Sequence, residues 1–487
     1  MSNASKSPIK RVAMLFSGGP APAANAVIST AAAAFVRDKI EVFGIKNGYT
    51  HLVKFVPGKS DPLTADDHYI VLDEDRLRRT RNSPGIMIGT ARANPGKKIE
   101  CPDDLKDSEK CAGLRSVYDA LCSMKIDALV SIGGDDTLRT AYKFLKFQET
   151  LPASARKIPI VHLPKTIDND YFGIDFTFGY NTAVDTMAGE IRNLLADAEA
   201  GRAYFIVESM GRGAGWLAYG AAIAGEASHV MSIEDLDDDM KTTEQVLNKL
   251  TQQMETRPIM KVDDLVERIV ALMLRREKNK KEFGVVVLAE GLAEFYPLNV
   301  GGNREPPIEV KYDEFGHISS SSVDFGKRMA KRVARRYAEV TGGDRKVNGV
   351  QLGYETRCAR PIAYDVMLGS QLGVGAYRAL VEQGKNGVMV SVEGQFQLKY
   401  VPFKELVNQK TLTTKVRLID KKNDFWQLAR FLESPISSED IAEVEQRKSE
   451  TDRRKAESDR RKSDAPQGKD GVDRRKEDRR KEIRRKS

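Results

Sequence analysis

The feature of this 487-residue sequence that most constrains its fold is a repeated unit of apolar run, polar turn and helix-like stretch. Residues 11–16 (RVAMLF) lead into SGGPAPAAN and then into an alanine-rich stretch over 26–36. Residues 126–132 (IDALVSI) lead into GGDDT and a helix-like stretch over 138–147. Strands that alternate with helices are typical of parallel α/β sheets. Four or five such units in roughly the first 180 residues predict a doubly wound α/β sheet.

A second series of units begins near residue 203. Residues 203–208 (AYFIVE) precede the loop SMGRGAGW, and Phe283–Ala289 and the start of 349–357 (GVQLGYETR) are also strand-like. We expect the charged residues 235–280 to be mostly helical, and 295–320 to form a long loop or hairpin. Further expectations are a basic amphipathic helix over 324–340 and strands within 386–402.

The densest polar cluster follows another strand-like run, which ends at Pro164. Lys165, Thr166, Asp168, Asn169 and Asp170 fall within six residues, in the motif PKTIDND. A lysine can hold phosphate oxygens, one carboxylate can accept a proton, and a second can help hold a metal ion. The alternative is a polar loop that caps a helix, since loops are usually polar.

The other polar clusters also follow strands, and the carboxyl ends of parallel strands meet at one edge of a sheet, where ligands bind. Ser17-Gly18-Gly19 and Gly133–Thr137 offer bare backbone for phosphate oxygens. An N-cap would explain one of the two aspartates in GGDDT, but not the pair. MGRG (210–213) and GYETR (353–357) each add an arginine suited to phosphate, although a lone arginine is more often a surface ion-pair partner.

Composition excludes several classes of protein. No apolar run approaches the roughly 18 residues of a membrane span, and the first twelve residues contain no apolar stretch, so we expect neither a membrane segment nor a secretory leader. The four cysteines show no CxxC spacing, which favours free thiols in a reducing cytoplasm. Residues 451–487 hold 16 Lys or Arg against 9 Asp or Glu, and so carry nearly all of the net charge of +8.

Taken together, GGPAPAAN, IDALVSIGGDDT, PKTIDND, ESMGRGAG, AEGL and GYETR occur in this order, each at a strand end. Over about residues 10–435 the chain resembles the phosphofructokinase family, which transfers a phosphoryl group to the 1-hydroxyl of fructose 6-phosphate with Mg²⁺. The resemblance implies two Rossmann-like lobes with mainly parallel sheets, and a homodimer or homotetramer. Two arginines that many family members reach across a subunit boundary have no clear match here; Arg202 and Arg345 lie near the expected positions.

The resemblance also implies the roles of individual residues. Asp168 matches the base that accepts the sugar hydroxyl's proton, Asp135 belongs to the magnesium site, and Asp170 is a supporting carboxylate near the metal. Catalysis is assigned to Asp168, Lys165, Asp136 and Arg212. The substrate-binding set is Gly18, Thr166, Ile167, Asp168, Met210, Gly211, Arg212, Glu290, Tyr354 and Arg357.

The phosphoryl donor is predicted to be pyrophosphate. Family members that use ATP usually have glycine at positions 136 and 165, where this chain has Asp136 and Lys165. A carboxylate at position 136 would repel the α-phosphate of ATP but not the shorter pyrophosphate. The alternative is that Asp136 caps a helix and pairs with Lys165. An ATP-dependent 6-phosphofructokinase is therefore the second candidate, and a non-catalytic polyanion-binding protein acting through its tail is the third.

The resemblance divides the chain into three parts. We expect residues 1–179 and 356–406 to form a phosphoryl-donor lobe, and 180–355 and 407–436 to form a sugar-phosphate lobe. Residues 437–487 form a charged tail with repeated DRRK segments and very few large aliphatic residues. Such a segment cannot bury a core, so we expect it to be disordered or transiently helical, dispensable for catalysis, and able to contact polyanions.

Overall fold

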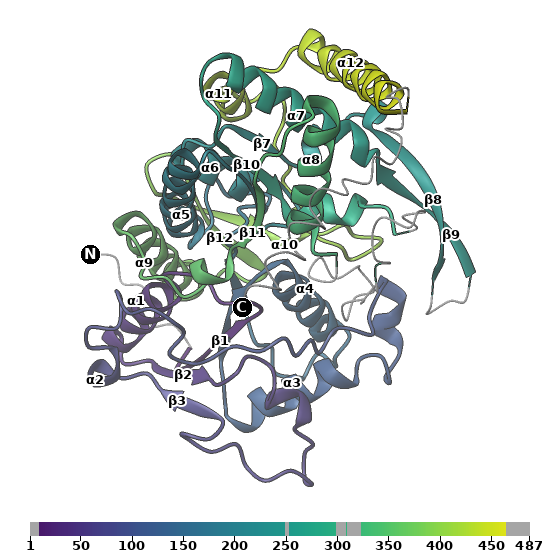
Figure 1. Cartoon of the computed structure of the whole chain (residues 1–487). Coiled ribbons are helices and arrows are strands. Elements are labelled where there is room, and N and C mark those ends of the chain that lie inside the picture. Colours follow the sequence, from purple (N-terminus) through teal and green to yellow (C-terminus); the bar gives the residue numbers. More distant parts are fainter. Residues whose placement is uncertain (1–8, 249–252, 299–307, 309–322, 464–487) are drawn as a thin grey trace, which may run out of the picture.

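Two separate β-sheets organise the chain, one above the other in Figure 1. The computed structural model describes residues 9–248, 253–298, 308 and 323–463. Most of the loop or hairpin expected over 295–320 lies outside these residues. Both sheets are mainly parallel and carry helices, so the predicted α/β fold of two Rossmann-like lobes is confirmed.

The larger sheet has seven strands in the order β13-β12-β5-β4-β1-β2-β3. Its inner strands are parallel, and β3 and β13 at the two edges are antiparallel to their neighbours. Central strands are buried along their whole length because helices cover both faces. The bounds are β1 Arg11–Ser17, β2 Glu41–Ile45, β3 Tyr69–Val71, β4 Ala128–Gly133, β5 Ile160–Pro164, β12 Val388–Glu393 and β13 Gln397–Pro402.

The smaller sheet has four parallel strands in the order β11-β6-β10-β7. Its strands are β6 Tyr204–Ser209, β7 His229–Met231, β10 Gly284–Ala289 and β11 Val347–Leu352. The helices of both sheets are α1 Ala24–Arg37, α2 Glu74–Leu77, α3 Ala112–Ser123, α4 Asp135–Glu149, α5 Tyr180–Gly201, α6 Trp216–Ala224, α7 Val262–Lys278, α8 Phe325–Thr341, α9 Ala363–Tyr377, α10 Phe403–Leu406, α11 Asp424–Leu432 and α12 Ser438–Ser463.

The chain crosses between the sheets more than once. After β11 it returns to the larger sheet, where β12 pairs with β5, and it then leaves again so that α11 packs on α6. Close packing of α1 on α9 fixes this return, because a side chain at Gly373 would begin only 2.7 Å from the carbonyl oxygen of Val27. The lobe boundaries at 179, 355, 406 and 436 stay predictions.

The expectation that residues 235–280 are mostly helical is wrong for the first half of that stretch. Lys241–Asn248 (β8) and Gln253–Met260 (β9) form an antiparallel hairpin that projects from the smaller lobe in Figure 1. Arg257 of β9 pairs with Glu244 of β8 at 2.7 Å, and its guanidinium also donates to the carbonyl oxygen of Glu294. These partners lie far apart in sequence, so a count of charged residues could not reveal them.

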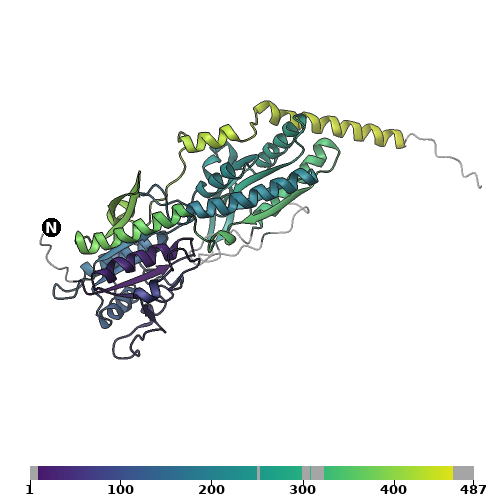
Figure 2. The same cartoon turned by 90° about the vertical axis from the view of Figure 1, so that its left-hand side faces the viewer.

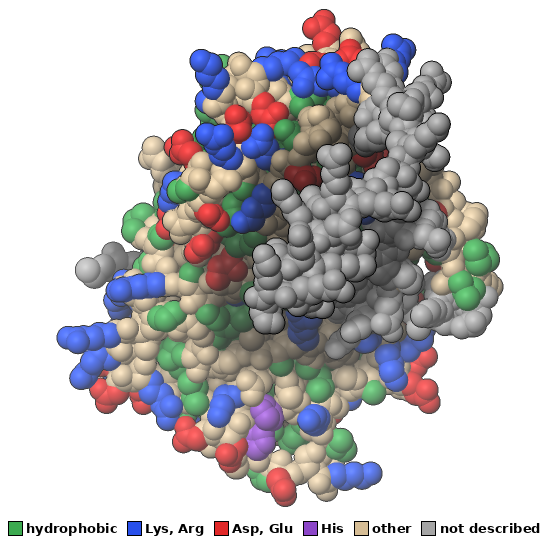
Figure 3. Space-filling model, in the orientation of Figure 1, with side chains coloured by type: hydrophobic (Ala, Val, Ile, Leu, Met, Phe, Trp, Pro, Cys, Tyr) green, Lys and Arg blue, Asp and Glu red, His purple; other side chains and the backbone are tan. Residues whose placement is uncertain are grey.

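The expectation of a disordered or transiently helical tail over 437–487 is corrected in its first part. Helix α12 packs against α7 and α8 at the end of the molecule farthest from the larger sheet (Figure 2). Val444 is fully buried, and charged side chains of both signs gather around this end (Figure 3). Arg275 pairs with Asp440 at 2.7 Å and Arg336 with Glu445 at 2.6 Å. The helix is thus held by the apolar side chains of Val444 and Ile441 and by long-range ion pairs.

Within the described ranges, every helix is either too short or too polar to cross a membrane.

Two truncations test the role of α12. Ending the chain after Ser437 removes Val444 and the ion-pair partners of α7 and α8, whereas ending it after Arg454 keeps them. Burial of one valine contributes about 1.5–3 kcal/mol, so the shorter chain should unfold at a clearly lower urea concentration. The longer truncation should match the full chain; equal stability of all three would show that the α12 contacts contribute little.

Candidate active site

A cavity of about 320 Å³ lies between the carboxyl ends of the two sheets and gathers residues from seven segments of the chain. Predicted site residues that line it are Gly18, Asp135, Asp136, Lys165, Thr166, Ile167, Asp168, Asp170, Met210, Arg212, Glu290, Tyr354 and Arg357. Gly211 does not line the cavity itself, but its N–H donates to Oε2 of the lining residue Glu290 at 3.2 Å. The structure thus brings the predicted residues together, while their individual roles stay predictions.

The loop after β5 turns sharply at its start. The N–H of Lys165 continues the sheet by donating to the carbonyl oxygen of Gly133 at 2.9 Å, and then Asp168 N–H donates to Thr166 Oγ1 at 3.0 Å. Asn169 adopts the left-handed conformation, with φ of 55°, and is fully buried. Asparagine tolerates this conformation better than most residues, and here it separates the side chains of Asp168 and Asp170.

Lys165 is a cation on the side of the cavity formed by the larger sheet. A Cβ atom at Gly18 would lie 3.8 Å from Lys165 Nζ, and one at Gly134 would lie 3.9 Å from it. The ammonium group therefore lies beside two bare glycine turns, each of which can approach an anion closely. Burial lowers the pKa of Lys165, and the carboxylates of Asp168 and Asp135 act in the opposite direction.

Asp168 is a half-buried residue of the cavity lining, and its Oδ1 atom is buried. Its Oδ1 atom accepts no hydrogen bond from the described residues, so an oxygen that needs a partner faces the site. Burial, followed by the charge of Glu290, raises the pKa of Asp168 above its ordinary value. Lys165 and Arg212 oppose this shift. A carboxylate with a raised pKa and a free lone pair is suited to accept a proton near neutral pH.

Two further carboxylates, Asp170 and Asp135, complete an acidic group with Asp168. Burial raises the pKa of Asp170 to about 7, and the charges of Asp168 and then Asp135 add to the effect. Three carboxylates that influence one another, two of them half-buried, are costly unless a proton or a cation is present.

The helix-capping alternative for Asp136 does not match the structure. Gly134 occupies the N-cap of α4, no side chain caps this helix, and Asp135 and Asp136 lie in its first turn. Asp136 pairs with Arg139 at 3.1 Å, one turn further along, and not with Lys165. Burial and then Asp135 raise the pKa of Asp136, and Arg139 opposes them.

The opposite side of the cavity is formed by loops of the smaller sheet. Met210 N–H donates to the carbonyl oxygen of Leu352 at 3.0 Å, which continues the pairing of β6 with β11. Gly211 has φ of 120°, and a Cβ atom there would lie 3.7 Å from Asp168 Oδ1, so the backbone of this loop approaches Asp168. The guanidinium of Arg357 lies 4.5 Å from the ring centre of Tyr354, and a Cβ atom at Gly19 would lie 3.9 Å from the Cζ atom of Arg357.

Arg92, Asn94 and Gln351 also line the cavity, and none of them was predicted as a site residue. A bridge between Ser17 and Ala91 brings this loop to the end of β1, and Gly18 N–H donates to the carbonyl oxygen of Ala91 at 3.0 Å. Arg92 follows the glycine-flanked apolar run GIMIG (85–89), and no acidic motif marks it. Its position therefore depends on the pairing with β1, which is not visible in the local sequence.

The described residues contain no group of three or more His, Cys, Asp or Glu side chains placed to hold a metal ion by themselves. Magnesium is usually bound by one or two carboxylates together with substrate phosphate oxygens and water. Asp135 and Asp170 lie close enough to raise the pKa of Asp170, and both line the cavity, so they fit such a partial site.

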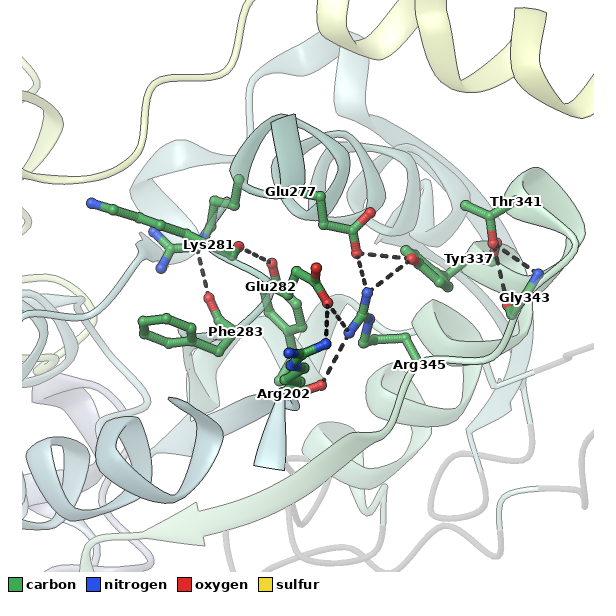
Figure 4. Close-up of polar contacts among 11 residues, drawn as sticks. Arg202, Glu277, Lys281, Glu282, Phe283, Tyr337, Thr341, Gly343 and Arg345 are labelled. Carbon is green, nitrogen blue, oxygen red and sulfur yellow. Dashed lines mark hydrogen bonds and ion pairs between the residues drawn. The ribbon is translucent and has the colours of Figure 1, made fainter. Parts of the chain in front are cut away.

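Arg202 and Arg345, left unassigned above, lie together at the opposite end of the smaller sheet and outside the cavity lining (Figure 4). Arg345 pairs with Glu277 at 2.9 Å and with Glu282 at 3.2 Å, and it also donates to the carbonyl oxygen of Arg202. Arg345 is thus engaged within its own chain, which argues against it as an arginine that reaches a neighbouring subunit.

Comparison with known proteins places this geometry in a family. A family model described as phosphofructokinase matches residues 11–380. The chain is 33% identical over 450 residues to a pyrophosphate–fructose 6-phosphate 1-phosphotransferase of Naegleria fowleri, covering 90% of this chain and 91% of the relative. It is 32% identical over 397 residues to an ATP-dependent 6-phosphofructokinase of Corynebacterium efficiens, covering 82% and 93%. The fold matches the crystal structure of a pyrophosphate-dependent phosphofructokinase from Marinobacter aquaeolei with a TM-score of 0.57 at 18% identity, covering 88% and 93%.

The raised pKa of Asp170 predicts how stability depends on pH in the absence of substrate and metal. With its pKa raised from 3.8 to about 7, the folded protein keeps a proton that the unfolded chain has already released. Stability should therefore fall as pH rises from about 4 to about 7, by up to about 1.4 kcal/mol per pH unit for this one group. Asp170→Asn should remove that dependence, measured by urea unfolding at several pH values.

The control for this measurement is Asp185→Asn on the exposed face of α5. That variant should keep the pH dependence of the parent protein. If Asp170→Asn also keeps it, Asp170 does not titrate near neutral pH.

Proposed function

The chain belongs to the phosphofructokinase family, and we propose that it transfers a phosphoryl group from pyrophosphate to the 1-hydroxyl of fructose 6-phosphate. The products are fructose 1,6-bisphosphate and phosphate, a reversible step of glycolysis. One observation carries the proposal: Lys165 lies beside two glycine turns in the same cavity as Asp135, Asp136 and Asp168. In this proposal Lys165 is the cation that binds the small phosphate donor, and Asp168 is the base beside it.

Positioning and neutralisation of charge are the main requirements of phosphoryl transfer. In the proposed reaction, Asp168 Oδ1 takes the proton of the sugar hydroxyl as its oxygen attacks the donor phosphorus. Lys165 and the amides of the loops at Gly18 and Gly134 hold the donor oxygens. Arg212 offsets the charge that develops on the transferred group.

The sugar phosphate is proposed to lie on the loops of the smaller sheet. Glu290 and the backbone at Gly211 contact the sugar, together with Thr166, Ile167 and Met210. Tyr354 and Arg357 bind the 6-phosphate. Glu290 is held against Gly211 N–H at 3.2 Å, so the sugar-binding carboxylate has a fixed position before substrate arrives.

We propose Mg²⁺ as the cofactor, with Asp135 and Asp170 as its protein ligands and donor oxygens completing its shell. When bound, it neutralises charge on the donor phosphates. Its charge would also offset the repulsion of Asp170 by Asp168 and Asp135, which adds to the effect of burial in raising the pKa of Asp170.

Asp136 is the proposed determinant of donor choice. Two unit charges about 4 Å apart repel by roughly 4 kcal/mol at an effective dielectric near 20, which disfavours the longer ATP at this position. Arg139 offsets part of the charge of Asp136, so the discrimination is smaller than that upper value. An ATP-dependent activity is the second candidate, favoured by the similarity to the Corynebacterium efficiens protein.

The proposal includes a cytoplasmic homodimer or homotetramer. The exposed apolar side chains of Leu428, Phe431 and Leu432 on α11, of which Phe431 is 85% exposed, offer a surface for a second copy. The tail beyond residue 437 is a further proposed contact for polyanions.

Replacing Asp168 tests the assignment of the base. Asp168→Asn keeps the size of the side chain but cannot accept the proton, so kcat should fall by about 100- to 10,000-fold with little change in the KM for fructose 6-phosphate. Asp185→Asn is the control and should keep full activity. A fall in kcat of less than tenfold would assign the base to another group.

A donor comparison tests the proposed substrate. The parent protein should turn over fructose 6-phosphate with pyrophosphate and barely with ATP, measured in a coupled assay. Asp136→Gly should lose pyrophosphate activity and gain relative activity with ATP, because the repulsive carboxylate is gone. A parent protein that prefers ATP contradicts the proposal, and one that uses neither donor contradicts the kinase assignment as well.

A further inference from the structure

Residues 414–419, here called the bridging segment, contact the loops of both sheets at the candidate site. Thr414 Oγ1 donates to Asp135 Oδ2 at 3.3 Å, and Arg417 N–H donates to the carbonyl oxygen of Asp170 at 2.8 Å. Ile419 N–H donates to Glu234 Oε1 at 3.0 Å, and the same carboxylate oxygen accepts from Gly215 N–H of the MGRGAG loop at 3.0 Å. One short segment thus links three loops that are distant in sequence.

Alternation along the bridging segment shows which side chains face inward. Val416 and Leu418 are 48% and 54% exposed, whereas Arg417 is half-buried and Ile419 is buried. Val416 forms an antiparallel bridge with Tyr171, immediately after the TIDND motif. The extended backbone therefore turns Arg417 toward the loop that carries Asp168 and Asp170.

The guanidinium of Arg417 binds backbone carbonyl oxygens of that loop. It donates to Ile174 at 2.8 Å and to Asp175 at 2.9 Å through one nitrogen, and to Asn169 at 2.7 Å through the other. With the Asp170 carbonyl bound to Arg417 N–H, four carbonyl oxygens between 169 and 175 accept hydrogen bonds from one residue. A planar fork with several donors can make these bonds together, and a lysine cannot.

Trp216 fixes Arg417 from the other side. The guanidinium lies 4.6 Å from the indole ring centre, and Trp216 Nε1–H donates to the carbonyl oxygen of Arg417 at 2.8 Å. Trp216 begins α6 directly after the MGRGAG loop. Arg417 therefore joins the loop of the proposed base to the loop of the proposed sugar site.

The contact with Asn169 bears most directly on the two carboxylates. Asn169 is in the left-handed conformation, and its side chain accepts Thr177 N–H at 3.0 Å while Arg417 binds its carbonyl oxygen. Hydrogen bonds thus hold both the side chain and the backbone of Asn169 in a conformation that non-glycine residues adopt rarely. A rotation there would move the neighbouring Asp168 and Asp170 in different directions.

We propose that Arg417 is a positioning residue for the reaction, which fixes the backbone of residues 169–175 so that Asp168 and Asp170 face the substrates. This inference rests on the proposed function. Arg417 lies outside the cavity lining and acts through the loop carbonyl oxygens. Displacement of a catalytic group by about 1 Å can cost on the order of 100-fold in rate. The loss should therefore appear in kcat and much less in KM.

The experiment compares Arg417 with a matched arginine of the same lobe. Arg430 is also partly buried, lies 5.0 Å from the ring centre of Trp426, and donates to a backbone carbonyl oxygen, that of Val230, at 2.7 Å. It is remote from the candidate site. Arg417→Met, Arg417→Lys and Arg430→Met are assayed for kcat and for both KM values. Hydrogen exchange of the amides of 169–178 is measured on each protein without substrate.

Arg417→Met should lower kcat by about 10- to 100-fold, with both KM values within about threefold of the parent, and its 169–178 amides should exchange about tenfold faster or more. Arg417→Lys should recover part of kcat. Arg430→Met should leave kcat within about threefold and exchange in 169–178 unchanged, even where it lowers the melting temperature. If Arg417→Met does not fold, Arg417→Lys is tested in its place. Its kcat should fall and its 169–178 amides should exchange faster, by smaller amounts.

Two results would overturn the inference: unchanged kcat and exchange in the Arg417 variants, or an equal loss of kcat in Arg430→Met. Failure of the proposed function is recognised separately, because it appears as a parent protein without pyrophosphate-dependent activity. Hydrogen exchange, measured without substrate, then still shows whether Arg417 fixes the 169–175 backbone.

Discussion

Mutual repulsion among the clustered carboxylates of Asp135, Asp168 and Asp170 is the constraint on which the rest of the structure depends. Burial raises the pKa of Asp170 to about 7, and the charges of Asp168 and then Asp135 add to the shift. Nothing in the local sequence would keep three such groups together, so surrounding elements must hold them in place. Lys165 supplies one cation, and the hydrogen bonds of Asn169 and Arg417 fix the loop between β5 and α5. The acidic centre is stable only as part of the whole arrangement.

The two-sheet architecture provides that arrangement because parallel strands direct their following loops to one edge. Loops after β1, β4 and β5 form one side of the cavity, and loops after β6, β10 and β11 form the other. Hydrogen bonds join the loops within each side: Lys165 to Gly133 in the first, and Gly211 to Glu290 in the second. The bridging segment then connects the two sides, so the position of the loop that carries Asp168 depends on a contact between residues 248 positions apart in sequence.

Local sequence was sufficient wherever a strand and its glycine turn decide the structure. GGDDT and TIDND follow the buried strands β4 and β5, GYETR follows the mostly half-buried β11, and the cavity gathers all three as predicted. The β8–β9 hairpin, α12, Arg92 and Arg417 were not foreseen, and they share one property. Arg257 binds Glu244 and the carbonyl oxygen of Glu294. The helix of Val444 packs against α7 and α8, and Arg417 donates to carbonyl oxygens of a distant loop. Their structure depends on partners that only the folded chain brings near.

The positions of Lys165 and Asp136 explain why a short donor suits this cavity. Lys165 is buried between the two glycine turns, whereas Asp136 lies in the first turn of α4 with its side chain 41% exposed and paired with Arg139. A compact anion can therefore contact Lys165 and the turn amides without extending past Asp136. A donor that continues beyond the second phosphate brings a further negative charge close to the Asp136 carboxylate, and like charges repel. Arg139 reduces this repulsion. Because its guanidinium is paired with Asp136, it adds little attraction for a third phosphate. Lys165 is buried and Asp136 is more exposed. This arrangement, more than the net charge of the cavity, favours pyrophosphate over a nucleotide.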